Sequence, residues 1–302
     1  MKLAGLVFAT LVSGTTLLGS PVWAAEHSTL EQIANSKVLT IANSLTSPPW
    51  QFRDASNLPA GFSIDLDRML AKDLGVDLVT IDMDWAGLIP ALLTRKSDIL
   101  ATTMSVTPER AKRIAFTSEA WYTTGVTAFM PPAAQVKSWE ELNRSGIRVS
   151  AKTGTTGVDT ARALFPLAEL QTYPSDVDIF QAVKTGRADV ALNDAETKSV
   201  AKIYDLAPVT APRELITNDP WAFATRPHDD ATWAYLNEFL KKIKADGRYA
   251  ALKAYWVDSE DWKHDYMEKR AGLSDQRLSL IKRLDIQDYV PNVNGKSRAS
   301  LK

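Results

Sequence analysis

Apolar side chains recur along this chain at two alternating spacings. Residues 38–42, Val-Leu-Thr-Ile-Ala, predict a strand, whereas residues 64–74 carry apolar side chains at helical spacing and end before Gly75. Residues 76–81 alternate as a second strand, and residues 88–93 open a second helix. This β-α-β-α order predicts an α/β fold with a largely parallel sheet.

A second unit of the same kind follows Pro131-Pro132. Residues 147–150 predict a strand, residues 158–164 a helix, and residues 188–192 a buried strand that ends at Asn193-Asp194. Ligands of open α/β sheets bind at the carboxyl ends of the strands. Two units whose loops face each other therefore predict a cleft for a small molecule.

The C-terminal part of the chain has a different pattern. Residues 232–256 carry one long amphipathic helical pattern, and the chain becomes more polar from residue 258 onward. One further helix is predicted at residues 275–284. The last dozen residues are expected to be frayed, because they combine Pro291 and Gly295 with several serines and lysines.

Composition excludes several function classes. The formal net charge of the 302 residues is -1, so nothing indicates a nucleic-acid partner. The chain has no cysteine, which excludes disulfides, thiol catalysis and thiolate metal sites. Its histidines, His27, His228 and His264, lie far apart without metal-ligand spacing. We therefore expect no metal and no cofactor.

Residues 1–24 have the features of a signal peptide. Lys2 precedes an apolar run at residues 3–18, and Val22-Trp23-Ala24 offers small residues for cleavage after Ala24. A membrane anchor is the alternative, but the run is short and contains glycine, serine and threonine. The mature protein is expected to be exported to the periplasm.

Residues 101–110 combine an apolar strand end, several hydroxyls and an arginine. Thr107 is expected to cap a helix that begins at Pro108, with Glu109 in its first turn. Free N–H groups at such a turn bind anions, and Arg110 can grip a carboxylate with two parallel hydrogen bonds. The alternative is an ordinary capped helix with a solvated arginine.

Several ordered motifs resemble one known family. Residues 61–66, Gly-Phe-Ser-Ile-Asp-Leu, resemble a signature of the polar amino-acid solute-binding proteins of ABC importers, solute-binding family 3, although Ser63 stands where an acidic residue is usual. Further matching segments occur at family spacing, at residues 85–92, 104–110, 116–118, 152–156 and 186–189. The resemblance covers about residues 39–256. It implies a two-lobed periplasmic-binding-protein fold, with a two-strand hinge and a ligand cleft between the lobes.

The resemblance also implies the domain organisation. Residues 26–127 and 222–257 would form lobe 1, and residues 128–221 would form lobe 2. The chain would cross between the lobes near residues 128–130 and 222–224. Residues 258–302 would be a C-terminal extension, and removal of residues 274–302 is expected to leave the fold largely intact because they lie beyond the resemblance.

The family's site maps onto residues of both lobes. Arg110 matches the position that grips the α-carboxylate of an amino acid, and Ser105 and Thr156 match positions that assist it. Asp194 matches the acidic group that binds the α-ammonium, with Thr103 as a helper. The alternative for Asp194 is capping of the helix that follows it.

Other positions concern the ligand side chain. Trp85 matches a position where an apolar or aromatic residue forms a wall over the ligand side chain. Trp50 either stacks on the ligand or packs in the core. Ser47 replaces a frequent stacking aromatic, and Ser44 replaces an aspartate of some cation-binding members. Lys152 matches a lysine of glutamine-binding members; its alternative is a solvated loop lysine. These residues favour a neutral or acidic polar ligand over lysine or arginine.

The resemblance implies a periplasmic receptor that delivers a polar amino acid to an ABC transporter permease. We expect a monomer without catalytic residues. The alternative is a cyclohexadienyl-dehydratase-like enzyme, which acts on prephenate or arogenate and needs a general acid. Glu196 is the nearest candidate for that acid, but its spacing from Asp194 does not match the Asp-x-x-Glu of that branch.

Overall fold

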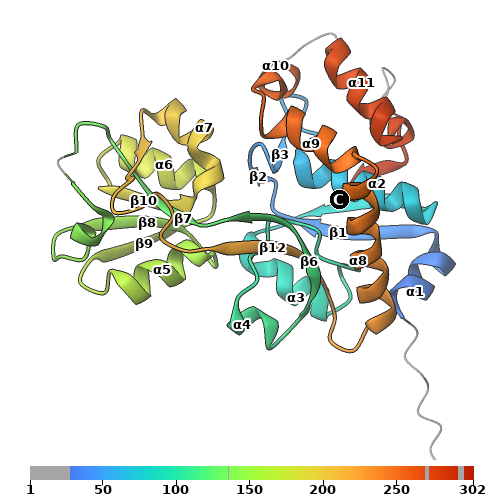
Figure 1. Cartoon of the computed structure of the whole chain (residues 1–302), viewed down its shortest axis with the longest axis horizontal. Helices are drawn as coiled ribbons and strands as arrows, with labels where there is room; N and C mark the ends of the chain where they lie inside the picture. Colours follow the sequence, from blue (N-terminus) through green and yellow to red (C-terminus); the bar gives the residue numbers. More distant parts are fainter. Residues whose placement is uncertain (1–27, 135, 269–271, 292–295) are drawn as a thin grey trace, which may run out of the picture.

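The computed structural model describes residues 28–134, 136–268, 272–291 and 296–302, which form two α/β lobes joined by a pair of long strands (Figure 1). The predicted two-lobed fold is confirmed. The signal-peptide prediction lies outside the described residues. Among the helices of the described residues, none combines the length and apolarity needed to cross a bilayer.

Lobe 1 contains a parallel sheet with the strand order β1-β5-β13. The strands are β1 (Val38–Asn43), β5 (Asp77–Asp82) and β13 (Ala299–Leu301). A small antiparallel sheet beside it contains β2 (Thr46–Ser47), β3 (Gln51–Arg53) and β4 (Pro59–Ala60). The helices of this lobe are α1 (Thr29–Ser36), α2 (Phe62–Leu74), α3 (Leu88–Leu93), α4 (Pro108–Ala111), α8 (Asp230–Ala245), α9 (Arg248–Trp256), α10 (Asp261–Tyr266) and α11 (Asp275–Leu284).

Glycine sets the beginning of α2. The φ angle of Gly61 is +127°, and a Cβ there would lie 2.3 Å from the carbonyl oxygen of Trp50. Only glycine allows this close approach of two backbones. At the other end Gly75 adopts the left-handed conformation and closes the helix, as its position in the sequence predicted.

The helical pattern of residues 232–256 forms two helices instead of one. α8 ends at Ala245, and α9 begins after Gly247, whose φ angle is +79°. A left-handed residue interrupts the helical ladder and redirects the chain. Both helices still bury apolar residues of the pattern, Leu236, Leu240 and Leu252 among them.

Lobe 2 is a five-stranded sheet with helices on both faces. The strand order is β11 (Ala207–Pro208), β7 (Val126–Met130), β10 (Val190–Asp194), β8 (Arg148–Lys152) and β9 (Glu169–Tyr173). β10, β8 and β9 are parallel, whereas β7 is antiparallel to β10 and β11. The helices of this lobe are α5 (Thr156–Leu164), α6 (Asp176–Lys184) and α7 (Lys198–Ala201).

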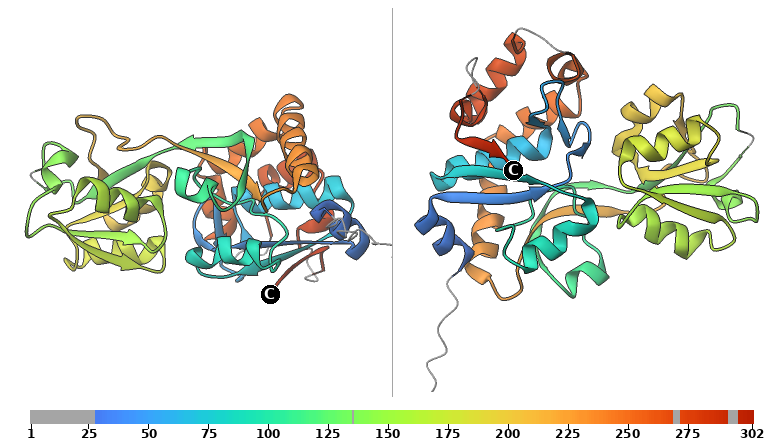
Figure 2. Two further views of the ribbon diagram at one scale, coloured as in Figure 1. Left: turned by 90° about the horizontal axis from the view of Figure 1, so that it is seen from below. Right: turned by 180° about the vertical axis from the view of Figure 1, so that it is seen from behind.

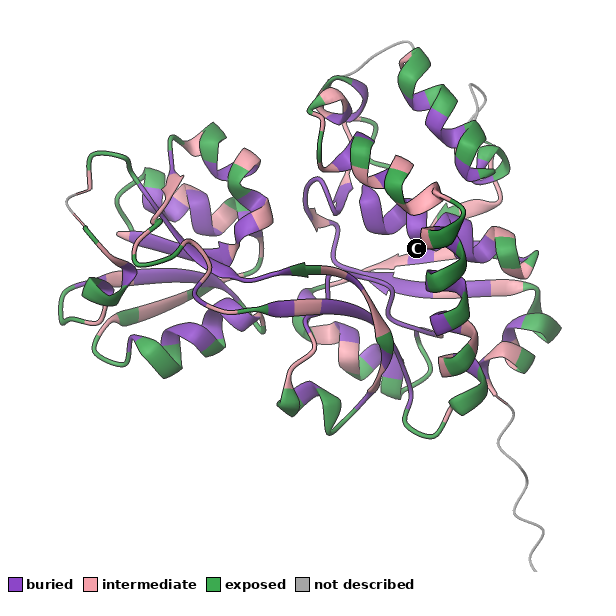
Figure 3. Cartoon of the chain, in the orientation of Figure 1, coloured by how far each residue is buried: buried purple, intermediate pink, exposed green. Residues whose placement is uncertain are grey.

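Alternating side chains of β10 pack into two separate hydrophobic cores of lobe 2. Val190 and Leu192 pack with Val158 of α5, whereas Ala191 packs with Phe180 of α6. Successive side chains of a strand point to opposite faces, so a fully apolar strand is buried on both sides. Figure 3 shows this burial along the strands and inward helix faces of both lobes.

Two antiparallel strands connect the lobes, β6 (Ala115–Thr124) and β12 (Asp219–Thr225) (Figure 2). Residues 128–130, expected at the first crossing, instead pair with β10 and β11 inside the lobe 2 sheet. Gly125 separates β6 from β7, and a Cβ there would stand 2.1 Å from the carbonyl oxygen of Thr217. The crossing segments therefore approach too closely for any side chain at this point.

The C-terminal extension is not frayed where the structure describes it. α11 spans the predicted residues, and its Leu280, Ile281 and Leu284 belong to the lobe 1 core. β13 pairs with β5 and extends the sheet. The expectation of a loose tail is wrong for residues 296–302, because pairing with a distant strand satisfies their backbone groups.

Candidate functional site

Arg110 is positioned by the short helix α4. Thr107 caps this helix by accepting a hydrogen bond from the backbone N–H of Arg110, and Pro108 occupies the first helical position, as predicted. The guanidinium turns inward and is buried, so the solvated-arginine alternative is wrong. It donates to the carbonyl oxygens of Ser105 at 2.9 Å and of Gly154 at 3.2 Å. Since Gly154 belongs to lobe 2, Arg110 reaches across the cleft.

Asp194 ends β10 on the opposite lobe. Its side chain makes no capping hydrogen bond, and its buried Oδ1 has no hydrogen-bond partner within the described residues. Burial, followed by the nearby Asp219 and Asp176, raises the pKa of Asp194 to about 8. The raised pKa favours the protonated form of the carboxyl. A cation placed beside it would favour the ionised form.

Lys152, at the end of β8, is buried, so it is not a solvated loop lysine. Its Nζ donates to Thr46 Oγ1 at 2.8 Å and to Ser47 Oγ at 3.1 Å. The same ammonium lies 3.7 Å from Asp176 Oδ1 and 5.3 Å from the centre of the Trp85 ring. These contacts connect lobe 2 to β2 of lobe 1.

Thr103 and Trp85 are fixed by hydrogen bonds. Gln51 Nε2 donates to Thr103 Oγ1 at 2.8 Å, and the Trp85 Nε1 donates to the Gly154 carbonyl at 3.1 Å. Gly154 thus accepts from both Arg110 and Trp85. One backbone carbonyl of lobe 2 therefore contacts two side chains of lobe 1.

Most of the predicted site residues line one cavity between the lobes. They are Trp85, Thr103, Ser105, Arg110, Lys152, Thr156 and Asp194. The cavity volume is about 20 Å³, which has room for about one water molecule. An amino acid can therefore enter only when the lobes separate or side chains move.

Thr155, Asp176 and Asn193 also line this cavity, but no motif in the sequence indicated them. The sequence likewise gave no indication of Asp219, a buried residue of β12 whose pKa is raised by burial. Asp176 follows strand β9, so the rule that ligands bind at the carboxyl ends of strands could have identified it. An aspartate in the first turn of a helix is common, however, and gave no separate indication of a site.

Trp50 and Ser47 do not line the cavity. Trp50 is buried in an aromatic cluster, with ring centres 4.9 Å from Trp221 and 5.3 Å from Phe62. Of the two interpretations of Trp50, core packing agrees with this position. Ser47 is connected to the site by the hydrogen bond that it accepts from Lys152.

Glu196 lies beside a different interlobe cavity. It lines this space together with Tyr122 and Lys198, and burial followed by Glu196 raises the pKa of Tyr122. Glu196 therefore does not line the cavity that contains Arg110 and Asp194.

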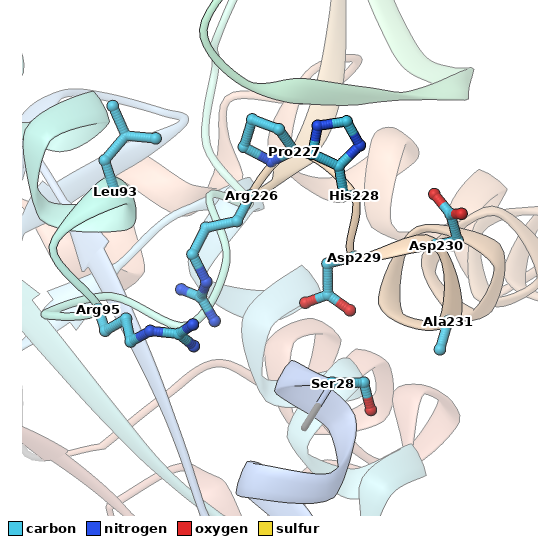
Figure 4. Close-up of a pocket in the computed structure, with 9 residues that line it drawn as sticks. All are labelled: Ser28, Leu93, Arg95, Arg226, Pro227, His228, Asp229, Asp230 and Ala231. Atoms are coloured by element: carbon cyan, nitrogen blue, oxygen red, sulfur yellow. The ribbon is translucent and has the colours of Figure 1, made fainter. Parts of the chain in front are cut away.

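A further cavity, of about 540 Å³, lies on lobe 1 and includes none of the predicted site residues (Figure 4). Two of its charged residues are engaged by the fold. Arg226 donates to the carbonyl oxygens of Leu92 and Ser97, and Asp229 caps α8 and accepts from the Thr29 backbone. No group of three or more acidic or histidine side chains suited to a metal ion occurs within the described ranges.

This chain is similar to known proteins along most of its length. Residues 39–259 match the bacterial extracellular solute-binding proteins, family 3. A cyclohexadienyl dehydratase of Pseudomonas aeruginosa is 26% identical over 249 residues, 80% of this chain and 91% of that protein. The ABC transporter arginine-binding protein 1 of Escherichia coli is 30% identical over 219 residues, 70% of this chain and 88% of that protein.

A solved structure shows the same two-lobed architecture. The crystal structure of an ancestral amino acid-binding protein, described as a precursor of cyclohexadienyl dehydratase, is 33% identical with a TM-score of 0.72. The match covers 76% of this chain and 100% of that one. The family match spans both lobes and the strands between them, so this chain belongs to the bacterial extracellular solute-binding proteins of family 3.

Proposed function

We propose that this protein is a periplasmic receptor that captures a polar amino acid and delivers it to an ABC transporter permease. The observation that carries the proposal is the placement of Arg110 and Asp194 on opposite lobes of one cavity. An α-amino acid has a carboxylate and an ammonium, and both must be paired when they are buried. This cavity offers one partner for each charge.

The residues proposed to contact the two charges of the ligand line this cavity. Arg110 would grip the carboxylate, with Ser105 and Thr156 beside it. Asp194 would ionise against the ammonium, with Thr103 nearby. Because the two charged partners belong to different lobes, the ligand would complete the pairing only when the lobes close.

The side-chain end of the ligand would face Lys152 and Trp85. A buried ammonium repels a cationic side chain and can donate to an acceptor, so a neutral or acidic polar ligand remains favoured. The arginine-binding relative of Escherichia coli, by contrast, binds a cationic amino acid. The screen below therefore includes basic as well as neutral and acidic amino acids.

A thermal-shift screen of the protein amino acids tests the receptor function. A ligand that binds only the native state raises the melting temperature, by mass action. We expect a rise with at least one polar amino acid, followed by saturable binding in calorimetry. No shift and no heat with any amino acid would contradict the receptor function.

The periplasmic location is tested by intact-mass measurement of the osmotic-shock fraction. The mature chain should begin near Ala25 and be recovered without detergent. A membrane-bound species that retains Met1 would contradict export through a cleaved signal peptide.

A dehydratase is a second candidate function, supported by one specific observation. A general acid must hold its proton at the working pH, and the pKa of Asp194 is about 8. Asp194 shares its cavity with two cations, Arg110 and Lys152, which could bind carboxylates. Glu196, the acid considered from the sequence, lines another cavity.

Incubation with prephenate and with arogenate separates the two functions. Formation of an aromatic product, followed by its ultraviolet absorbance and lost in Asp194→Asn, would favour the enzyme. A thermal shift with amino acids and no turnover would favour the receptor. The control is Asp205→Asn, because Asp205 is exposed on lobe 2.

A further inference from the structure

A chain of two hydrogen bonds connects helix α2 to the proposed ligand cavity. The Ser63 hydroxyl donates to Gln51 Oε1 at 3.1 Å, and Gln51 Nε2 donates to Thr103 Oγ1 at 2.8 Å. Ser63 and Gln51 are fully buried and do not line the cavity, whereas Thr103 lines it. A change at either buried residue can therefore reach the cavity through Thr103.

The backbone holds Ser63 beside Gln51. At the beginning of α2, the N–H of Ser63 donates to the carbonyl oxygen of Trp50 at 2.8 Å. Gly61 permits this approach, because an added Cβ there would stand 2.9 Å from the backbone nitrogen of Gln51. The contact between the two side chains is therefore supported by the packing of α2 against the segment before β3.

The direction of the two hydrogen bonds follows from burial. A glutamine amide that turns over exchanges the positions of its oxygen and its nitrogen. The reversed amide would make Ser63 an acceptor and leave the proton of a fully buried hydroxyl without this bond, which costs free energy. Thr103 carries no such cost, because it lines a cavity in which water or a ligand can accept its proton.

The hydroxyl of Thr103 thus keeps a proton for the cavity. It accepts from Gln51 Nε2, and no hydrogen bond that it donates occurs among the described residues. A hydroxyl has one proton and two lone pairs. An ammonium cannot accept this proton, whereas a carboxylate or carbonyl oxygen can.

We propose that Ser63 and Gln51 are positioning residues, which fix Thr103 as a hydrogen-bond donor to an oxygen atom of the bound amino acid. This inference rests on the proposed receptor function and adds the direction of one contact. It also gives a role to Ser63, which stands where an acidic residue is usual. An ionised carboxylate only accepts hydrogen bonds, so an acidic residue here would turn the Gln51 amide and reverse the bond at Thr103.

Two substitutions of nearly unchanged shape test the direction of the bond. The carboxylate introduced by Gln51→Glu accepts from both hydroxyls, so Thr103 would donate to it instead of to the ligand. Thr103→Val removes the hydroxyl itself. Each change should weaken binding of the best amino acid of the screen by about tenfold or more. Because both act on one hydrogen bond, the double variant should bind within about threefold of Thr103→Val alone.

Calorimetry on the mature protein measures these affinities, together with three further variants. Thr103→Ser keeps the hydroxyl and should bind within about threefold of the wild-type protein. Ser63→Ala should weaken binding by about threefold or more, but by less than about twofold when Thr103→Val is also present. The matched control is Ser97→Ala, because Ser97 is an equally buried serine of lobe 1 whose hydroxyl donates to the Ile99 carbonyl. It should keep the wild-type affinity.

Two results would overturn the inference. One is binding by Thr103→Val within about twofold of the wild-type protein. The other is a double variant of Gln51→Glu and Thr103→Val in which the two losses multiply. That result would show that Gln51 acts through the fold and not through Thr103. If Gln51→Glu does not fold, the same comparison of Ser63→Ala with and without Thr103→Val decides.

Failure of the inference can be told apart from failure of the receptor function. If the wild-type protein binds an amino acid but the losses multiply, the positioning role alone is wrong. If no amino acid binds the wild-type protein, the receptor function and the inference are both wrong.

Discussion

Arg110 and Asp194 are held by the fold in different ways. Arg110 donates to carbonyl oxygens of both lobes, and its burial lowers its pKa while the group stays charged. Asp194 has an unpartnered Oδ1 within the described part of the chain and a pKa of about 8. A ligand would therefore find the arginine already oriented, whereas the aspartate would change its protonation state.

Replacement of Arg110 should remove most of the affinity. Arg110→Ala leaves a buried ligand carboxylate unpaired, which costs roughly 2–5 kcal/mol, or about 30-fold to several thousand-fold in affinity. Arg110→Lys should also bind poorly, because an ammonium lacks the planar two-pronged geometry. Calorimetry with the best ligand of the screen measures both losses.

Arg113→Ala is the control for this prediction, because Arg113 is exposed just after the same helix. It should bind as the wild-type protein does. Binding of Arg110→Ala within about twofold of wild type would contradict the proposed role of this arginine.

The pKa of Asp194 predicts how affinity depends on pH. If the α-ammonium of the ligand lowers this pKa, binding at pH values below about 8 releases a proton. Affinity should therefore rise as pH rises, by up to about tenfold per unit, and level off above about pH 8. Titrations at several pH values, in two buffers of different ionisation enthalpy, measure the slope and the proton released. A constant affinity from about pH 6 to 8 would show that Asp194 does not ionise on binding.

At the scale of elements, aromatic packing organises the inner part of lobe 1. Trp50 of the β2–β3 loop contacts Phe62 of α2, Trp121 of β6 and Trp221 of β12. Aromatic pairs at these separations stabilise the fold beyond the contribution from burial of their apolar area. The cluster thus links the strands that join the lobes to helix α2.

Trp50→Ala should act on stability rather than on ligand preference. Truncation of a buried aromatic side chain costs about 3–5 kcal/mol. Thermal melts of the unliganded protein should show a large fall in Tm, while the order of preference among amino acids stays unchanged. A changed preference among amino acids with a normal Tm would show instead that Trp50 contacts the ligand.

The C-terminal extension is anchored by a buried ion pair. Arg277 makes a two-pronged contact with Asp65 of α2, at 2.6 and 2.8 Å, and both side chains are fully buried. Burial acts to raise the pKa of Asp65, but Arg277 and Arg68 outweigh it and hold that pKa below its ordinary value. The Arg277 guanidinium also lies 5.3 Å from the Trp256 ring centre.

Arg277→Ala should therefore destabilise the fold by about 3–5 kcal/mol, because it leaves the Asp65 carboxylate buried without its main partner. Denaturant unfolding measures the loss. Arg298→Ala is the control, since its pair with Asp77 is exposed and should contribute less than about 1 kcal/mol. Removal of residues 274–302 should lower the stability further, contrary to the expectation from the sequence. A truncated protein of normal stability would show that the extension is dispensable.

At the scale of the whole molecule, contacts across the cleft hold the lobes together. Arg110 and Trp85 of lobe 1 donate to Gly154, and Lys152 of lobe 2 donates to Thr46 and Ser47. Several of these groups also line the proposed ligand cavity. Lobe closure and ligand binding therefore depend on the same side chains.

Gly125→Ala should disturb this closure without unfolding either lobe. An added Cβ would stand 2.1 Å from the Thr217 carbonyl oxygen, so the crossing segments must move apart. We expect an affinity loss of about tenfold or more, measured by calorimetry, and a larger radius of gyration in X-ray scattering with ligand present. Gly272→Ala is the control, because nothing lies within 4 Å of its added Cβ. Unchanged affinity and radius would show that this close approach does not govern closure.

Local signals in the sequence determined the α/β class and much of the element order. Helix α11, the Thr107 cap and the Gly75 stop follow from neighbouring residues alone. The motifs also identified the family, and the order of strands and loops predicted the cleft. These features were predictable because periodicity, capping and turn formation depend on residues close in the chain.

Only the tertiary structure decided which polar and aromatic residues are buried and beside what. Asp65 and Arg277 pair across 212 positions, and Lys152 meets Ser47 across 105. The core position of Trp50 and the raised pKa of Asp194 likewise depend on distant neighbours. Burial and electrostatic environment are set by elements that come together only on folding, so no local pattern contains them.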